Sequence, residues 1–161
     1  MSDQITVREA REEDHPYLVA FMAGLQDHER QIEANRSPGD VAGASHLAFL
    51  QSEIARDGGA IFVADLGAQP VGFIICQFLE EPGTYVLPGQ RRYGFVADFF
   101  VVSEARGSGA AQAIIDHATD YFRDEGVSVV RLYVLAGNEM AQRFYDKAGF
   151  RTYERVLEHK L

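Results

Sequence analysis

Cysteine is almost absent from this sequence: Cys76 is the single one among 161 residues. One thiol cannot form a disulfide bond within the chain, which excludes the small secreted domains that depend on such bonds. Because Cys76 ends an apolar run that begins at Val71, we expect a small buried hydrophobic side chain in a reducing compartment.

Long hydrophobic runs are missing as well. The first residues lack the basic stretch and apolar core of a secretion signal, and the apolar segments are shorter than the roughly 20 residues that span a bilayer. The sequence therefore predicts a cytoplasmic protein that does not bind membranes.

Basic residues are scarce relative to acidic ones, and the formal net charge is −9. An acidic surface repels phosphate backbones and anionic lipids, so we expect no nucleic-acid partner. Residues 1–80 carry 13 acidic and 5 basic side chains, whereas residues 81–161 carry 11 and 10. This asymmetry has two explanations: solvated helix surfaces, or an acidic wall around a site for a cationic ligand.

Apolar periodicity and chain breakers predict a single α/β domain over residues 1–161 with a mixed sheet. The expected element order is β-α-α-β-β-β-α-β-α-β. Strands are expected at residues 5–8, 60–65, 71–79, 92–102, 127–135 and 150–157, the second and third as antiparallel neighbours. Helices are expected from Asp14 to about Glu33, over residues 41–56, from the glycine-rich segment after Arg106 to Gly126, and from Asn138 to Gly149.

The segment Arg106-Gly-Ser-Gly-Ala-Ala stands between a predicted strand and a predicted helix. Free N–H groups and the positive end of a helix dipole meet at such a turn, which favours phosphate or pyrophosphate binding. Gly107 and Gly109 allow close approach of the backbone, and Arg106 adds a cation. Alternatively, the two glycines only turn the chain. The common nucleotide loops fit poorly, because Gly-Lys-Ser/Thr is absent and Gln112 stands where the dinucleotide pattern has its third glycine.

A second pattern follows after one more strand. Together, Arg106-x-x-Gly109-x-Ala111 and Asn138-x-x-Ala141-x-x-Phe144-Tyr145-x-Lys147-x-Gly149-Phe150 resemble the Gcn5-related N-acetyltransferases, the GNAT superfamily. The resemblance covers roughly residues 60–150, and the preceding elements fit the same order. It implies the GNAT fold, a mixed, mostly antiparallel sheet flanked by helices, with acetyl-CoA as co-substrate.

The resemblance also implies a set of coenzyme-binding residues. In the family, the main chain of the fourth strand pairs with the pantetheine arm, the next turn holds the pyrophosphate through N–H groups, and an asparagine contacts the coenzyme arm. The corresponding residues are Phe99, Phe100, Val101, Arg106, Gly107, Ser108, Gly109, Ala110, Ala111, Gln112, Asn138 and Ala141.

Tyr145 matches the family tyrosine that protonates the departing thiolate. The chemistry agrees, because a thiol has a pKa of about 8.5 and a tyrosine one of about 10, so the proton transfer is only slightly uphill. This mechanism needs no metal, and the histidines show no metal-site spacing. The alternative is an aromatic packing residue beside Phe144.

The acceptor amine arrives as a cation and must lose a proton, which requires carboxylates. Glu29 and Asp98 are the catalytic candidates, and His28 and Glu29 are candidates for substrate binding. These residues show a weaker similarity to the spermidine/spermine acetyltransferase branch. That branch has an aromatic residue where this sequence has His28, and a glutamate just before the strand aspartate, where this sequence has Ala97. Asp98 either orients or deprotonates the amine, or it caps a backbone or pairs with an arginine. His28 and Glu29 either touch substrate or are solvated.

The leading hypothesis is an acetyl-CoA-dependent N-acetyltransferase that acts on a primary amine of a small, cationic molecule by direct transfer in a ternary complex. One alternative is acetylation of a protein N-terminus or lysine, and another is a non-catalytic, acyl-CoA-binding regulatory module. Nucleotide-phosphate binding at the glycine-rich turn is a third. The resemblance implies a homodimer, since this state is common in the family.

Overall fold

Residues 4–161 are described by a computed structural model. Its strands are β1 (Ile5–Glu9), β2 (Gly59–Leu66), β3 (Gln69–Glu80), β4 (Arg92–Val101) and β5 (Val130–Leu132). Its helices are α1 (His15–Ile32), α2 (Gly39–Asp57), α3 (Ala110–Asp124) and α4 (Glu139–Lys147). Within this described range, no helix is both long and apolar enough to cross a lipid bilayer.

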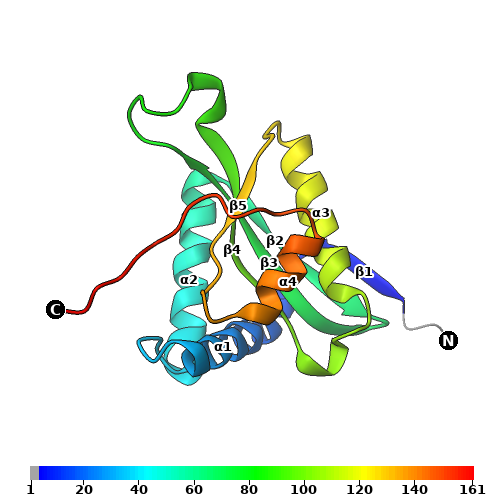
Figure 1. The fold of residues 1–161 in the computed structure, drawn as a ribbon. Coiled ribbons are helices and arrows are strands. Elements are labelled where there is room, and N and C mark those ends of the chain that lie inside the picture. The colour runs from blue at the N-terminus through cyan, green and yellow to red at the C-terminus, as the bar shows by residue number, and fades with distance from the viewer. Residues whose placement is uncertain (1–3) are drawn as a thin grey trace.

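The strands form one sheet in the order β1-β2-β3-β4-β5 (Figure 1). Neighbours from β1 to β4 are antiparallel, and β5 is parallel to β4. The predicted mixed, mostly antiparallel sheet and the predicted pairing of β2 with β3 are thereby confirmed. The parallel step follows from the intervening α3, which carries the chain back before β5 begins.

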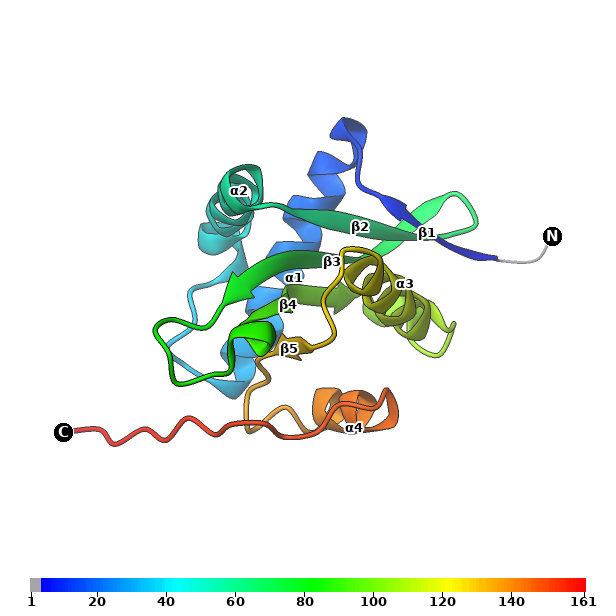
Figure 2. The same cartoon turned by 90° about the horizontal axis from the view of Figure 1, so that it is seen from above.

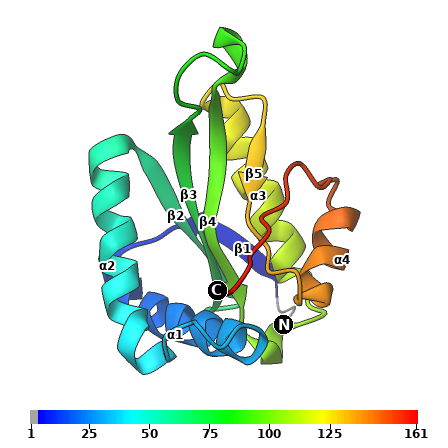
Figure 3. The ribbon, with the colours of Figure 1, turned by 60° about the vertical axis from the view of Figure 1, so that its left-hand side comes forward.

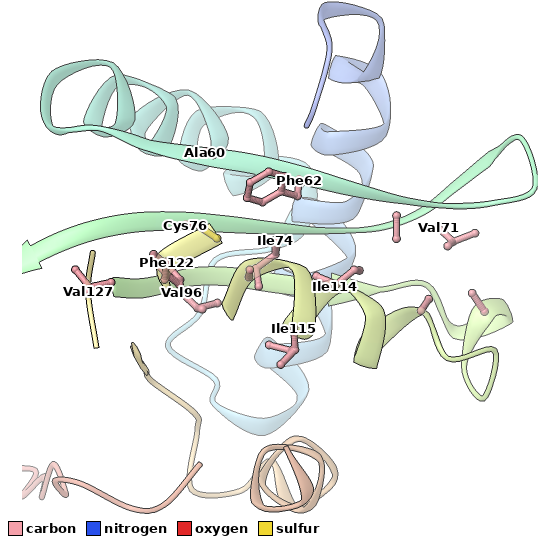
Figure 4. Packing of buried hydrophobic residues seen from close by; sticks show 14 residues of the cluster. Ala60, Phe62, Val71, Ile74, Cys76, Val96, Ile114, Ile115, Phe122 and Val127 are labelled. Carbon is pink, nitrogen blue, oxygen red and sulfur yellow. The ribbon is translucent and has the colours of Figure 1, made fainter. Parts of the chain in front are cut away.

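Helices cover both faces of this sheet (Figure 2). On one face, α1 contributes apolar residues at helical spacing, which pack with residues of α2, β2 and β3: Leu18, Phe21, Met22, Leu25, Leu47, Leu50, Val63, Phe73 and Ile75. On the other face, α3 packs against the sheet through Ile114, Ile115 and Phe122 (Figure 4). The two cores share the sheet as their middle layer.

The helices α1 and α2 cross one another (Figure 2), and they lie very close together at the start of α2. An added Cβ on Gly39 would stand 2.3 Å from the carbonyl oxygen of Ala23, which leaves no room for a side chain. Asp27 accepts a hydrogen bond of 2.7 Å from the N–H of Gly39, and this bond satisfies a donor at the start of α2. Asp27 therefore joins the two helices.

A β-bulge interrupts the pairing of β4 with β3. Ile75 is paired with Asp98 and Cys76 with Val96, so Ala97 has no partner of its own. Because of this extra residue, each side chain of β4 after Ala97 faces the opposite side of the sheet from the side that strict alternation would give it. Val96 packs in the α3 core, whereas Ala97 and Phe100 pack against the α1 and α2 core, and Asp98 contacts α2.

Two predicted elements at the C-terminal end are corrected. The strand expected at residues 127–135 is limited to Val130–Leu132, and the final strand expected at residues 150–157 does not form. The segment after α4 instead contacts β5 through side chains, with the Arg131 guanidinium 4.2 Å from the ring centre of Tyr153. Beyond this contact it extends away from the body (Figure 1) and passes in front of the sheet in the turned view of Figure 3. Val156 on this segment is 90% exposed.

Candidate active site

The strands β4 and β5 separate at the centre of the molecule. Their pairing ends at Val96 with Leu132, but β4 continues to Val101 with this edge free of β5. The opening leads into a cavity of about 450 Å³, whose walls come from β4, the residues after β5, the start of α3, and α4. Its volume and mainly apolar walls are typical of a small-molecule site.

Most of the predicted site residues line this one cavity. They are Glu29, Asp98, Phe99, Phe100, Val101, Arg106, Gly107, Gly109, Ala110, Ala111, Gln112, Asn138, Ala141 and Tyr145. Ser108 and His28 are not among its lining residues. Ser108 braces the turn instead, because its hydroxyl donates to the carbonyl of Ala105 at 2.6 Å and accepts from the N–H of Ala110 at 3.3 Å.

The turn before α3 adopts a backbone that favours glycine. Gly107 and Gly109 have φ angles of 80° and 91°, in the left-handed region. Gly109 is the N-cap of α3, and the N–H groups of the first turn have no acceptor within the helix. These donors, the helix dipole and the exposed Arg106 together make the end of the cavity suitable for an anion.

Tyr145 lies on α4 among aromatic rings, with Phe99, Phe144 and Phe150 between 5.5 and 6.4 Å away, measured between ring centres. Burial raises the pKa of its phenol strongly, and the negative charges of Glu29 and Asp98 raise it further. The phenol is therefore protonated at neutral pH, as a proton donor must be.

Asn138 begins α4. Its side-chain oxygen accepts a hydrogen bond of 3.2 Å from the N–H of Ala141, so it acts as the N-cap. The amide nitrogen of Asn138 is not used in this bond and remains available to a ligand in the cavity.

Two carboxylates stand at the same cavity as Tyr145. Burial raises the pKa of Glu29, and the nearby negative charge of Asp98 raises it further. The Arg36 guanidinium, with its Nε atom 3.4 Å from Oε2 of Glu29, acts in the opposite direction and lowers this pKa. The Asp98 side chain is only 12% exposed. Two carboxylates that repel one another have a strong affinity for a cation.

A sequence model of the acetyltransferase (GNAT) family matches residues 25–150. This chain belongs to that family. The match includes every residue assigned above to the cavity.

Known GNAT proteins resemble the chain in sequence and in fold. N-alpha-acetyltransferase 30 of Schizosaccharomyces pombe is 29% identical over 62% of the chain and 63% of its own length. A mycothiol acetyltransferase of Paenarthrobacter aurescens is 30% identical over 93% of the chain and 47% of its own. A solved aminoglycoside N-acetyltransferase in complex with CoA superposes with a TM-score of 0.73 at 18% identity, covering 100% of this chain and 97% of the other. The chain spans less than two thirds of the length of the curated relatives named here.

One residue beside this cavity was not singled out by sequence reasoning. His46, on α2, lies with its Nε2 atom 3.1 Å from Oδ2 of Asp98. Within residues 4–161, the partner of Asp98 is thus a histidine, and neither an arginine nor a backbone group. No local signal could have identified this pair, because 52 residues separate the two and the bulge at Ala97 decides which way Asp98 faces.

Proposed function

We propose that this protein transfers the acetyl group of acetyl-CoA to a primary amine of a small, cationic molecule, directly within a ternary complex. The observation that carries the proposal is the position of Tyr145. This protonated phenol lies in one cavity with an anion-binding turn and with the carboxylates of Glu29 and Asp98.

The cavity suits the parts of acetyl-CoA in turn. The free edge of β4 from Phe99 to Val101 offers backbone groups to the amides of the pantetheine arm, and the walls beside it are apolar. The turn at Gly107 and Gly109 suits the pyrophosphate, since a Cβ at either glycine would meet no atom within 4 Å. The thioester end would then lie toward Tyr145.

The proposed chemistry needs one base and one acid. The acceptor ammonium binds between Glu29 and Asp98, and one of its protons passes to Asp98. The electron pair left on nitrogen forms a bond to the thioester carbonyl carbon, and the carbon–sulfur bond breaks. Tyr145 donates its phenolic proton to the sulfur, so that CoA leaves as a neutral thiol. The acylated nitrogen loses its second proton through water to the Tyr145 phenolate, and Asp98 releases the first proton to solvent. Burial raises the pKa of Tyr145. The departing thiolate would form in the same apolar cavity, where desolvation raises the pKa of a thiol as well.

The two carboxylates of Glu29 and Asp98 favour a cation as the acceptor. A mycothiol and an aminoglycoside acetyltransferase among the similar proteins support a small molecule, whereas N-alpha-acetyltransferase 30 supports a second candidate, a protein N-terminus. An α-amino group carries less positive charge at neutral pH than a primary alkylamine. The charge of Glu29 and Asp98 therefore favours the small amine.

The test is thiol release from acetyl-CoA with a panel of polyamines, aminoglycosides, amino acids and N-terminal peptides. We expect acceleration by cationic small amines and little by peptides. Binding of CoA without acceleration by any amine would indicate a non-catalytic module. Protection against melting by ATP, and not by CoA, would indicate a nucleotide site instead.

We also propose that the protein acts in the cytoplasm as a homodimer. A free, fully buried Cys76 is compatible with a reducing compartment. The segment after α4 exposes Val156 and Leu157 at 90% and 91%, which favours contact with a second copy. Sedimentation equilibrium of the full chain and of a chain ending at Glu154 tests this, and an unchanged monomer mass in both would reject it.

A further inference from the structure

The pair formed by His46 and Asp98 is a polar contact between two layers of the fold. Asp98 comes from the bulged part of β4 and His46 from the middle of α2. Among residues 4–161, His46 is the one side chain within hydrogen-bonding distance of Asp98. When Asp98 is ionised, the neutral ring must donate its Nε2–H, because a bare Nε2 would face a carboxylate oxygen with a second lone pair.

The side chains of Asp98 and His46 face different surroundings. Asp98 is one of the residues that line the cavity, whereas His46 is not. The imidazole is 36% exposed, so its Nδ1 atom can exchange protons with solvent. The charged groups that act on the ring are Asp98 from β4 and Glu29 from α1, and on its own helix it stacks on Phe49.

We propose that His46 is a positioning residue for acetyl transfer, which holds the carboxylate of Asp98 toward the acceptor amine and sets its negative charge. The inference rests on the proposed function, in which Asp98 takes a proton from the ammonium. The ammonium N–H bond breaks, its proton forms an O–H bond on the oxygen of Asp98 that His46 does not hold, and the nitrogen keeps the electron pair. His46 keeps its Nε2–H throughout this step.

Protonation of His46 at Nδ1 changes the charge of the pair from −1 to zero. A neutral pair attracts an ammonium less and is a weaker base. The hydrogen bond to Asp98 raises the pKa of His46 above its usual value, and the charges of Asp98 and Glu29 add to this against the effect of burial. Activity is therefore expected to fall with decreasing pH as His46 gains its proton, with a midpoint above about 6.5.

The test compares pH profiles of kcat/KM for the acceptor amine. His46→Gln keeps an N–H donor near the position of Nε2 but does not titrate, so we expect kcat near the wild-type value at pH 8 and an acidic limb shifted to lower pH. His46→Ala loses the donor, and we expect kcat to fall about ten-fold at every pH. His159→Gln, on the exposed C-terminal segment, is the matched control and is expected to keep the wild-type profile. A profile of His46→Gln that superimposes on the wild type would overturn the proposal.

A second measurement does not depend on turnover. NMR titration of the His46 imidazole is expected to give a lower pKa in Asp98→Asn than in the wild type, in the presence of CoA. An equal pKa in both would show that the pair does not act as a unit, and the proposal would be wrong. Failure of the proposed function has a different signature, because then no amine accelerates thiol release in the wild type at any pH.

Discussion

Asp14 is a buried charge that the site does not use. Its carboxylate, 3% exposed, binds the Arg8 guanidinium at 2.7 Å and accepts from the N–H of Arg11 at 2.7 Å. Asp65 holds the same guanidinium from β2, also at 2.7 Å. The network ties the start of α1 to the edge of the sheet, and so fixes the position of the helix that carries Glu29.

We expect Asp14→Asn to lower the free energy of unfolding by about 3 kcal/mol at pH 7, because it leaves a partly buried guanidinium without one partner. Arg8 lowers the pKa of Asp14 in the folded state. The stabilisation is therefore present above the ordinary pKa of about 3.9 and is lost as pH falls through the folded value. Urea unfolding at pH 7 and pH 3 measures it. Glu13→Gln, on a neighbouring side chain that is 75% exposed, is the control, with an expected change below about 0.5 kcal/mol.

Tyr145 gives a prediction about the chemical step. Tyr145→Phe removes the proton donor and keeps the ring, so we expect kcat to fall about 100-fold or more with little change in thermal stability. Thiol release at saturating amine measures this effect. Tyr121→Phe, which removes a hydroxyl from α3 outside the cavity, is the control. Equal rates for wild type and Tyr145→Phe would assign the phenol to packing only.

Asn138 combines two roles that one substitution can separate. Serine also caps helices but lacks the amide N–H group. We expect Asn138→Ser to unfold at nearly the wild-type temperature and to have a several-fold higher KM for acetyl-CoA. Asn138→Ala should show the higher KM and also lose about 1 kcal/mol of stability. An unchanged KM in both variants would restrict Asn138 to capping.

At the scale of elements, the closeness of α1 and α2 determines where Glu29 and His46 stand. Gly39→Ala would place a methyl group against the carbonyl of Ala23, so we expect a loss of about 1–3 kcal/mol in stability and a higher KM for the amine. Gly89→Ala is the control, because its Cβ would meet nothing within 4 Å. Thermal unfolding and amine kinetics of the two variants test this, and equal behaviour would mean that the helices adjust freely.

Most elements could be predicted because their signals are local. The apolar spacing of α1 and the two glycines before α3 each act within a few residues, and both elements form where expected. The segment after α4 has a strand-like composition, but a strand also requires a partner edge. The three residues of β5 offer a short one, and Tyr153 stacks on Arg131 instead.

At the scale of the whole molecule, the charge of −9 attracts cations over long distances. We expect the KM for a cationic amine to rise several-fold when the ionic strength increases from about 0.01 M to about 0.15 M, because the Debye length falls from about 30 Å to about 8 Å. Steady-state kinetics with a monoamine and a polyamine test this, and the polyamine should show the steeper dependence. A KM independent of salt for both would restrict the attraction to contacts within the site.

The order of elements up to α4, the glycine-rich turn before α3 and the motif with Asn138 and Tyr145 were determined by the sequence alone, since short-range spacing and backbone preference specify them. The direction in which Asp98 points was decided only by the tertiary structure. Side chains alternate along a strand, and strict alternation would place Asp98 with Val96 against α3. The bulge at Ala97 breaks this alternation and turns Asp98 toward His46, from a helix 52 residues away.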